Sequence, residues 1–489
     1  MVEAATDDGQ YDILILGAGL SGIGMACHLA RDCPGKRVGL LERRQALGGT
    51  WDLFRYPGVR SDSDMLTFGY AFRPWNELKV LADGPSIRRY IEETAREYGI
   101  DRAVRYGVDA IHATWSSERR NWTVTVRSVA TGLLSTLECR FLIACTGYYR
   151  YDDGYLPDYP GLSAFQGCVV HPQHWPEDLD YRGKRVVVIG SGATAVTIVP
   201  AMAIDAAHVI MLQRSPTYIF SIPSRDKISA VLKYILPAAW VYRLARKRNI
   251  ALQRFIYKAA QRWPQQVGAL LRKAAGRQLA GQANLDDFTP RYAPWEQRPC
   301  AVPDGDLFKA IREGKVSVLT DTIDTFTAHG IRLQSGRQLD ADIVVSATGF
   351  QLQSLGGMTL DVDGVPRVAS ELMTYKSVLL QDTPNMAVIF GYANASWTLK
   401  VDIAATYVCR LLNHMNSQGI AVSTPRAPPG LRLEETILDQ LSSGYVRRGG
   451  RAMPRQGRAG VWRVTHNYET DRAMLLRESI DDDALLFER

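Results

Sequence analysis

Two glycine-rich loops, far apart in the chain, constrain its fold more than any other feature. The first, Gly17-Ala-Gly-Leu-Ser-Gly22, follows a short apolar run at residues 11–16 and precedes a helical stretch that reaches about Arg31. The second, Gly190-Ser-Gly-Ala-Thr-Ala195, follows the apolar run Arg185–Ile189 and precedes another helical segment. A glycine-rich loop between a strand and a helix is typical of a βαβ unit that binds a dinucleotide. Two such units indicate that two nucleotides are held at once.

The first loop has the features of an FAD site. Gly17 makes the tight turn, Gly19 lets the backbone approach a pyrophosphate, and Gly22 lets the helix pack against the strand. The N-terminus of the helix favours the negative phosphates. Glu42 follows Gly22 by 20 residues, at the end of the predicted strand Val38–Glu42, where a carboxylate can accept hydrogen bonds from ribose hydroxyls. The alternative is a glycine-rich turn in an ordinary α/β protein.

The second loop differs from the first at the position that faces the ribose. Ala195 replaces the third glycine, which the motif tolerates. The predicted strand His208–Gln213 is followed by Arg214, which would pair with a 2′-phosphate that a carboxylate would repel. We therefore predict an NADPH site made by Gly190, Ser191, Gly192, Ala193, Thr194, Ala195 and Arg214. The alternative for Arg214 is a solvated surface side chain. Together the two sites indicate a flavoenzyme, in which the flavin accepts hydride from the nicotinamide.

Chain length and two further apolar runs predict the arrangement of the domains. A chain of 489 residues is longer than a single hydrophobic core usually accommodates, so more than one domain is expected. The runs at 141–144 and 343–347 each lead to a glycine, Gly147 and Gly349. We expect an α/β fold of two Rossmann-like domains, with the NADPH domain inserted in the FAD domain. The expected division is 1–150 for the FAD domain, 151–335 for the NADPH domain with a helical subdomain at 225–285, and 336–489 for the rest of the FAD domain and a C-terminal surface wrap.

The positive charge is concentrated in one segment. Residues 225–280 contain thirteen Lys and Arg but one acid, Asp226, whereas the whole chain has a net charge of +7. Ile228, Val231 and Ile235 recur there at helical spacing. Three interpretations are open: a solvated helical face, peripheral contact with an anionic membrane, or nucleic-acid binding. The last lacks any accompanying motif, so we expect no nucleic-acid partner.

Cysteine and histidine spacing argues against other classes of site. The seven cysteines form no C-x-x-C pair, which favours a reduced, cytoplasmic protein, with membrane association kept open. Cys27 and Cys33 lack the close pairing that a disulfide reductase needs. His171 and His174 would need a third ligand, and Pro172 beside them argues against a helix, so we expect no metal. The acidic start and the lack of a long apolar run predict neither a secretory signal nor a membrane span.

Two longer motifs resemble those of a known family. Phe165-Gln-Gly-Cys-Val-Val-His171-Pro-Gln-His-Trp175-Pro176 resembles the signature of type I Baeyer–Villiger monooxygenases. The stretch Gly48-Gly-Thr-Trp-Asp-Leu-Phe-Arg-Tyr-Pro-Gly-Val-Arg-Ser-Asp62 resembles their second conserved segment. The resemblance extends over nearly the whole chain. It is strongest to the mycobacterial EthA/MymA-like group, on Ser215-Pro-Thr-Tyr218 and Asn394-Ala-Ser-Trp-Thr-Leu-Lys400.

The resemblance implies roles for individual residues. Asp62 would lie near the flavin and orient a catalytic arginine, Arg298. His171 would belong to a loop that couples the two domains and would donate no proton. Many family members carry a lysine before the arginine that also contacts the 2′-phosphate, whereas this chain has Gln297. The residues implied to contact FAD are Gly17, Gly19, Ser21, Gly22, Glu42, Thr50, Trp51, Asp52 and Asp62.

The resemblance also implies an activity. It predicts an NADPH- and O₂-dependent flavin monooxygenase that converts ketones to esters or lactones through a peroxyflavin. A permanently charged Arg298 suits such chemistry because two anions must be stabilised in turn. The protonated intermediate would oxygenate sulfur or nitrogen, so sulfides and thioamides are further substrate classes. The alternatives are an N- or S-oxygenating flavin monooxygenase without ketone activity and a non-catalytic FAD/NADP-binding redox sensor. The sequence predicts no oligomeric state.

Overall fold

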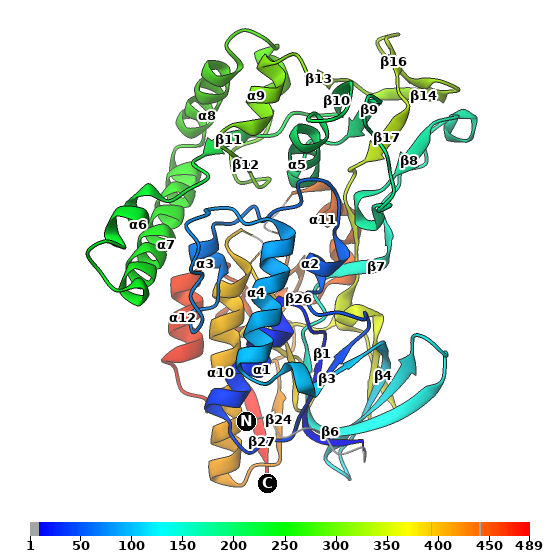
Figure 1. Ribbon diagram of the computed structural model, residues 1–489. Coiled ribbons are helices and arrows are strands. Elements are labelled where there is room, and N and C mark those ends of the chain that lie inside the picture. The colour runs from blue at the N-terminus through cyan, green and yellow to red at the C-terminus, as the bar shows by residue number, and fades with distance from the viewer. Residues whose placement is uncertain (1–8, 393, 440–441) are drawn as a thin grey trace.

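The computed structural model describes residues 9–392, 394–439 and 442–489. Its two largest sheets lie in separate halves of the molecule, the larger one in the lower half of Figure 1. The central strands β1 and β2 are parallel and almost completely buried, as expected for short apolar runs covered on both faces. The strands of this sheet are β1 (Gln10–Leu16), β2 (Val38–Glu42), β3 (Val104–Tyr106), β4 (Val108–Ser116), β5 (Asn121–Ser128), β6 (Leu134–Ala144), β19 (Thr359–Val362), β20 (Val365–Arg367), β21 (Thr374–Tyr375), β22 (Leu379–Leu380) and β23 (Met386–Val388).

The second sheet has five parallel strands in the order β13-β10-β9-β17-β8. They are β8 (Cys168–Val170), β9 (Arg185–Ile189), β10 (His208–Gln213), β13 (Val316–Thr320) and β17 (Ile343–Ser346). Helices α5 (Ala193–Met202) and α9 (Asp306–Arg312) cover it. The predicted strands of both nucleotide units agree with β2, β9 and β10 to the residue, because each is an apolar run that a glycine or a charged residue ends. The predicted α/β class with two Rossmann-like sheets is confirmed.

The second sheet lies within the chain path of the first. The chain leaves the first sheet after β6, forms the second sheet, and returns for β19. The two crossing segments, β7 (Tyr149–Gly154) and β18 (Phe350–Leu352), pair with each other in antiparallel fashion. The expected boundary at residue 335 was too early, because β17 pairs with β9 and therefore belongs to the second sheet. We call the part with the larger sheet the first domain and the inserted part the second domain.

The helical segment after the second unit connects both domains. Its helices are α6 (Lys227–Leu232), α7 (Ala238–Arg262) and α8 (Pro264–Leu279). Helix α8 packs against α9 of the second domain, whereas α7 packs against α3 (Met65–Phe68) of the first. The expectation that the whole helical segment belongs to the NADPH domain was therefore wrong for α7.

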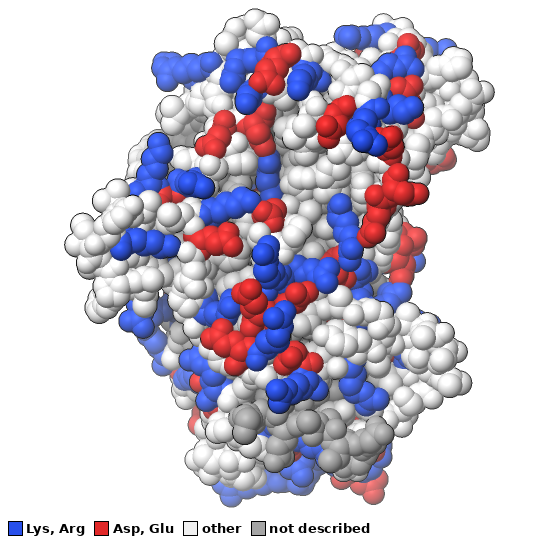
Figure 2. Space-filling model, viewed as in Figure 1, with Lys and Arg blue, Asp and Glu red and all other residues white. Residues whose placement is uncertain are grey.

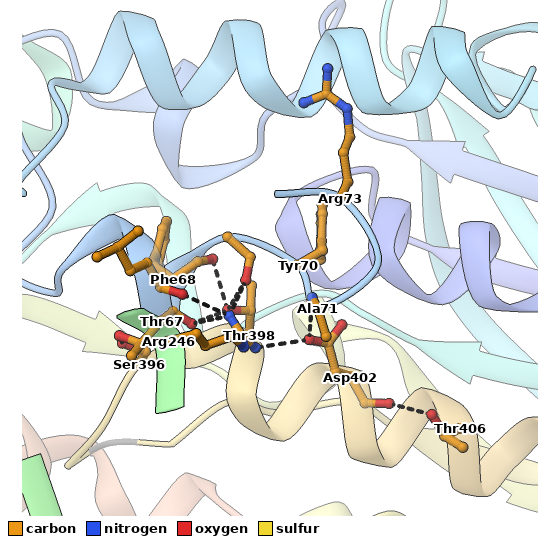
Figure 3. Close-up of polar contacts among 12 residues, drawn as sticks. Thr67, Phe68, Tyr70, Ala71, Arg73, Arg246, Ser396, Thr398, Asp402 and Thr406 are labelled. Carbon is orange, nitrogen blue, oxygen red and sulfur yellow. Dashed lines mark hydrogen bonds and ion pairs between the residues drawn. The ribbon is translucent and has the colours of Figure 1, made fainter. Parts of the chain in front are cut away.

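Arg246 on α7 explains this attachment. The side chain is buried, and its Nη2 donates to Asp402 Oδ2 at 3.2 Å (Figure 3). Its Nη1 donates to three main-chain oxygens, those of Leu66, Thr67 and Gly69, at 3.1, 3.1 and 2.7 Å. A buried guanidinium is stable only when its donors are satisfied, and here carbonyls of the first domain and one carboxylate satisfy them.

The C-terminal region is part of the core rather than a surface wrap. Helix α10 (Trp397–Gln418) packs against α1 (Leu20–Asp32) and α12 (Tyr468–Leu476). Trp462 and Leu475 are buried in the same apolar cluster as β1, so the expected surface wrap was wrong. The expectation failed because it rested on the many Gly and Arg residues of this region and overlooked the apolar residues among them.

The other elements are α2 (Thr50–Leu53), α4 (Gly84–Glu97), α11 (Gly444–Gly449), β11 (Ile219–Ile222), β12 (Cys300–Pro303), β14 (Ile323–Thr327), β15 (Gly330–Leu333), β16 (Gln338–Asp340), β24 (Val422–Pro425), β25 (Arg432–Thr436), β26 (Arg455–Gly457) and β27 (Leu485–Glu488), with short 3₁₀ turns between them.

Candidate active site

A cavity of about 330 Å³ lies between the two domains. Gly17 and Gly19 line it from the first glycine loop, and Ala193 and Thr194 line it from the start of α5, just after the second loop. Arg298, which precedes β12, also lines it. The cavity therefore brings both predicted nucleotide loops and the predicted catalytic arginine to one space.

The first loop has the geometry that a bound pyrophosphate needs. Gly17 has φ = 95°, a left-handed conformation that favours glycine. A Cβ on Gly22 would lie 1.8 Å from the carbonyl oxygen of Gly17, so any side chain there would push α1 away from β1. Gly22 does not line the cavity, which fits its expected role in helix packing. The loop thus brings the N-terminus of α1 to the cavity wall, where free N–H groups favour an anion.

Glu42 lies at the end of β2 and lines the cavity although it is buried. Its two carboxylate oxygens each accept a main-chain N–H, from Ala18 and from Arg44, both at 2.8 Å. Burial raises the pKa of Glu42, and these two hydrogen bonds partly oppose that effect. Each oxygen keeps a lone pair for a further donor. The residue therefore fits the role of an acceptor for ribose hydroxyls.

The other residues predicted to contact FAD divide into two groups. Ser21, Thr50 and Trp51 line the cavity, and the hydroxyl of Ser21 accepts a hydrogen bond from Trp397 Nε1 at 2.8 Å. Asp52 does not line it, and a contact between this residue and FAD stays a prediction. The buried Asp52 carboxylate is occupied by three guanidinium groups, those of Arg44, Arg55 and Arg88, at 2.7, 3.2 and 3.0 Å.

The second loop is anchored to strand β10 and to the residues that follow that strand. The N–H of Gly190 donates to Leu212 on β10 at 2.8 Å, and Ser191 Oγ donates to the carbonyl of Ser215 at 3.0 Å. These bonds hold the loop beside Arg214, which is exposed. Of this predicted set, Ala193 and Thr194 line the cavity, whereas Gly190, Ser191, Gly192, Ala195 and Arg214 lie outside its lining.

Arg298 and Asp62 form an ion pair that crosses between the domains. Arg298 Nη2 lies 3.3 Å from Asp62 Oδ1 and donates to Ser63 Oγ at 2.9 Å. Asp62 belongs to the first domain and Arg298 to the second, and both line the cavity. Trp295, three residues before Arg298, has φ = 70°, an uncommon conformation for a large side chain. The loop that presents Arg298 is thus held in a specific shape.

Aromatic side chains form a large part of the wall near this pair. The ring centroids of Tyr149 and Phe350 are 4.5 Å apart, and those of Phe350 and Phe54 are 5.2 Å apart. Tyr148 packs against Trp397 with centroids 5.4 Å apart. All five rings line the cavity. A wall of this kind gives the space beside Arg298 an apolar surface.

Comparison with known proteins decides the family. The family model described as flavin-binding monooxygenase-like matches residues 86–416, more than half of the 489-residue chain. The chain belongs to this family. A second model, described as an NAD(P)-binding Rossmann-like domain, matches residues 15–83 around the first glycine loop. As a member, this protein is a flavin-dependent monooxygenase and hence an oxidoreductase.

Individual relatives agree with this assignment. The FAD-containing monooxygenase MymA of Mycobacterium tuberculosis is 58% identical over 482 residues, which cover 98% of this chain and 97% of that one. The FAD-containing monooxygenase EthA of the same species is 49% identical over 480 residues, covering 98% of each chain. These matches confirm the resemblance to the EthA/MymA-like group. An oxidised steroid monooxygenase solved with bound NADP shares the fold, with a TM-score of 0.70 and 23% identity over 86% of this chain and 88% of that one.

The signature segment of this monooxygenase lies against the two linker strands. His171 Nε2 donates to the carbonyl of Gly349, next to β18, at 3.1 Å, and its Nδ1 accepts the N–H of Gln173 at 3.2 Å. This pattern assigns a neutral imidazole with the proton on Nε2. Gln173 Nε2 donates to the carbonyls of Arg150 and Tyr151 on β7. His171 does not line the cavity, so its contacts are with the linkers rather than with reacting groups.

Arg448 lies near the second loop, although the sequence did not single it out. Its guanidinium lies 3.6 Å above the ring of Tyr155, and Nη2 donates to the carbonyl of Thr348 at 3.1 Å. Thr348 follows β17, the neighbour of the strand that leads into the second loop. Burial and the nearby positive charge of Arg214 both lower the pKa of Arg448. Arg448 comes from a distant segment without a motif, so no sequence signal identified it.

Within residues 9–392, 394–439 and 442–489, no cluster of His, Cys, Asp and Glu could hold a metal ion. All seven cysteines lie in this part of the chain and are free thiols. No helix in the described ranges is long and apolar enough to cross a bilayer.

Proposed function

We propose that this protein is an NADPH- and O₂-dependent monooxygenase that converts ketones to esters or lactones. The observation that supports this most is the Asp62–Arg298 pair, placed in the cavity between two nucleotide loops. A protein that only binds two nucleotides has no need for a charged pair aimed into the space between them. The pair therefore favours catalysis over a non-catalytic redox sensor.

The residues of the first loop fit FAD. Glu42 offers carboxylate acceptors at the cavity wall, and the N-terminus of α1 faces the same space. We assign Gly17, Gly19, Ser21, Glu42, Thr50 and Trp51 to the FAD site, with Gly22 as the packing residue. Bound FAD would accept hydride from NADPH, activate O₂ and supply one oxygen atom to the substrate.

The residues around the second loop fit NADPH. Two arginines lie near the loop: Arg214 follows β10, and Arg448 on α11 donates to the carbonyl of Thr348 after β17. They are close enough for the charge of Arg214 to lower the pKa of Arg448. Two guanidinium groups together suit a dianionic 2′-phosphate, which accepts several charge-assisted hydrogen bonds. Gln297 stands where many relatives of this class carry a lysine, and we infer that Arg448 supplies the missing positive charge from another part of the chain.

Arg298 has the properties required for ketone oxygenation. A guanidinium stays protonated at any physiological pH, so it can stabilise negative charge as it develops on the carbonyl oxygen of the substrate. Asp62 and Ser63 orient it, which removes the cost of arranging the donor during the reaction. The aromatic wall of Phe54, Tyr149 and Phe350 offers an apolar surface on which a bound ketone would displace water from the reacting atoms.

Product analysis tests this proposal. Purified protein loaded with FAD would be incubated with NADPH and O₂ and a panel of linear, cyclic and aryl ketones, together with sulfides and a thioamide. We expect esters or lactones whose added oxygen carries the label of isotopic O₂. Sulfoxides with no ester from any ketone would favour the S-oxygenating alternative. NADPH oxidation that no substrate stimulates, and no oxygenated product, would favour the sensor.

A further inference from the structure

Helix α7 presents an unusual outer face. Its inner face carries Tyr242 and Arg246, which are buried against the first domain. The residues that recur every three or four positions on the opposite face are all exposed. They combine apolar and basic side chains without a single acid: Trp240, Leu244, Lys247, Ala251, Phe255, Lys258 and Arg262.

Helix α6 and the turn after it extend this face with large apolar side chains. Tyr234 is 92% exposed and Ile235 is 74% exposed, while Phe255 on α7 is 68% exposed. Ile228 and Val231 are exposed as well. Single exposed apolar residues are ordinary, but several large ones on two helices that pack against each other indicate a binding face. We call the outer face of α6 and α7 with these residues the α6–α7 face.

The charges on the α6–α7 face are positive and directed outward. The one acid of the segment, Asp226, caps α6 and is paired with Arg248 at 2.5 Å, so it does not face the solvent. Arg254 is used in a pair with Glu469 on α12. For Lys247, Lys258 and Arg262 the described part of the chain provides no salt-bridge partner. At the left edge of Figure 2, where α6 and α7 lie, the surface is white and blue.

We propose that the α6–α7 face docks on an anionic lipid bilayer. A helix that lies in a membrane interface needs apolar side chains that enter the headgroup region and basic side chains that contact anionic lipids, and α7 offers both on one stripe. Residues 225–280 have a net charge of +12, so the remainder of the +7 chain is net acidic, and attraction to a negative surface acts on this segment. The α6–α7 face contributes no residue to the cavity lining, so docking leaves the active site accessible.

A vesicle sedimentation experiment tests the proposal on the full-length, FAD-loaded protein. Vesicles of phosphatidylcholine and phosphatidylglycerol in equal parts would be compared with vesicles of phosphatidylcholine alone. We expect binding to the anionic vesicles at low salt and its loss as salt is raised. The double variant Lys247→Gln/Lys258→Gln should lower the partition coefficient by roughly 30-fold. Trp240→Ser/Phe255→Ser should lower it as well, because apolar insertion is lost.

The control is a variant with equal loss of exposed apolar surface elsewhere. Leu133 and Ile204 are both 71% exposed and lie outside the α6–α7 face, so Leu133→Ser/Ile204→Ser should bind vesicles like the wild type. NADPH oxidation should be unchanged in all three double variants, which shows that each is folded. Absence of binding at low salt would overturn the proposal. Vesicle binding that persists undiminished in the two α6–α7 variants would also overturn it. So would a wild-type dimer that dissociates only in those variants, because the face would then bind a second copy of the chain. Binding to a DNA oligonucleotide as strong as binding to anionic vesicles would contradict a lipid-specific role.

Discussion

Arg298 and Asp62 approach to 3.3 Å although they belong to different domains. The contact depends on how the inserted domain sits on the first one, because Asp62 lies on a loop of the first and Arg298 precedes β12 of the second. The hydroxyl of Ser63 adds a second acceptor on the same loop, at 2.9 Å. The pair can therefore form only when the two domains are correctly oriented, which links domain orientation to the charge offered to the substrate.

Replacing Arg298 should separate the two half-reactions. In Arg298→Ala we expect flavin reduction by NADPH to continue while oxygenation of a ketone slows by roughly 100-fold or more, since a preorganised donor contributes about 3 kcal/mol to such a step. Anaerobic reduction followed by absorbance, and product yield under O₂, measure the two steps. Arg291→Ala removes an exposed arginine from the same loop and should leave both unchanged. Undiminished ester formation in Arg298→Ala would remove the proposed catalytic role.

Arg214 and Arg448 should determine the preference for NADPH over NADH. Losing a charge-assisted hydrogen bond to phosphate costs about 1.5–3 kcal/mol, so Arg214→Ala and Arg448→Ala should each raise KM for NADPH by roughly 10-fold or more. KM for NADH should change little, because NADH lacks the 2′-phosphate. Steady-state kinetics with both cofactors measure this. The neighbouring exposed Arg447 is the matched control, and a uniform rise in both KM values would point to a structural effect instead.

Arg246 and Lys247 are adjacent cations that should behave in opposite ways. Arg246→Met leaves Asp402 and three main-chain oxygens without their buried donor, and we expect the free energy of unfolding to fall by about 3–5 kcal/mol. Lys247→Met removes an exposed charge and should change stability by less than about 0.5 kcal/mol. Denaturant unfolding of the two variants compares them directly. If both variants changed the free energy of unfolding by the same amount, the hydrogen bonds of buried Arg246 would make no specific contribution to stability.

His171 should affect coupling more than flavin binding. Its two ring nitrogens connect Gly349 and Gln173 beside the linker strands, and the side chain is absent from the cavity wall. In His171→Ala we expect FAD to stay bound while more of the consumed NADPH yields hydrogen peroxide and less yields oxygenated product. Peroxide and product measured against NADPH consumed give the coupling ratio. A variant that loses FAD but keeps that ratio would contradict the expected role.

His171 should also make the free energy of unfolding depend on pH. Burial disfavours the imidazolium and lowers the pKa of His171 below its ordinary value of about 6.5. The unfolded chain therefore binds a proton more readily, so the contribution of neutral His171 to stability is full above about pH 6.5 and is lost as the pH falls below it. The difference in free energy of unfolding between wild type and His171→Ala should shrink from pH 8 towards pH 5. A difference that grows on acidification would show the opposite sign.

Some features were predictable because their causes are local. The strand, loop and helix around Gly17 and around Gly190 follow one another directly, so apolar runs and glycine spacing were sufficient to predict them. The ion pairs of Asp52 were not predictable, because its three arginine partners lie at positions 44, 55 and 88 and only the fold brings them together. The basic segment was correctly seen as helical, but composition does not distinguish the buried Arg246 from the exposed Lys247 beside it.

The sequence by itself determined that this chain holds two dinucleotide units and carries the motifs of a flavin monooxygenase. Those properties depend on residues within about 30 positions of one another, where chain connectivity already places them together. Only the tertiary structure decided which distant groups meet: Arg298 with Asp62, Arg448 beside the second loop, and Arg246 with Asp402. These contacts form only when the two domains and the helical segment pack against each other. No local sequence pattern therefore predicts them.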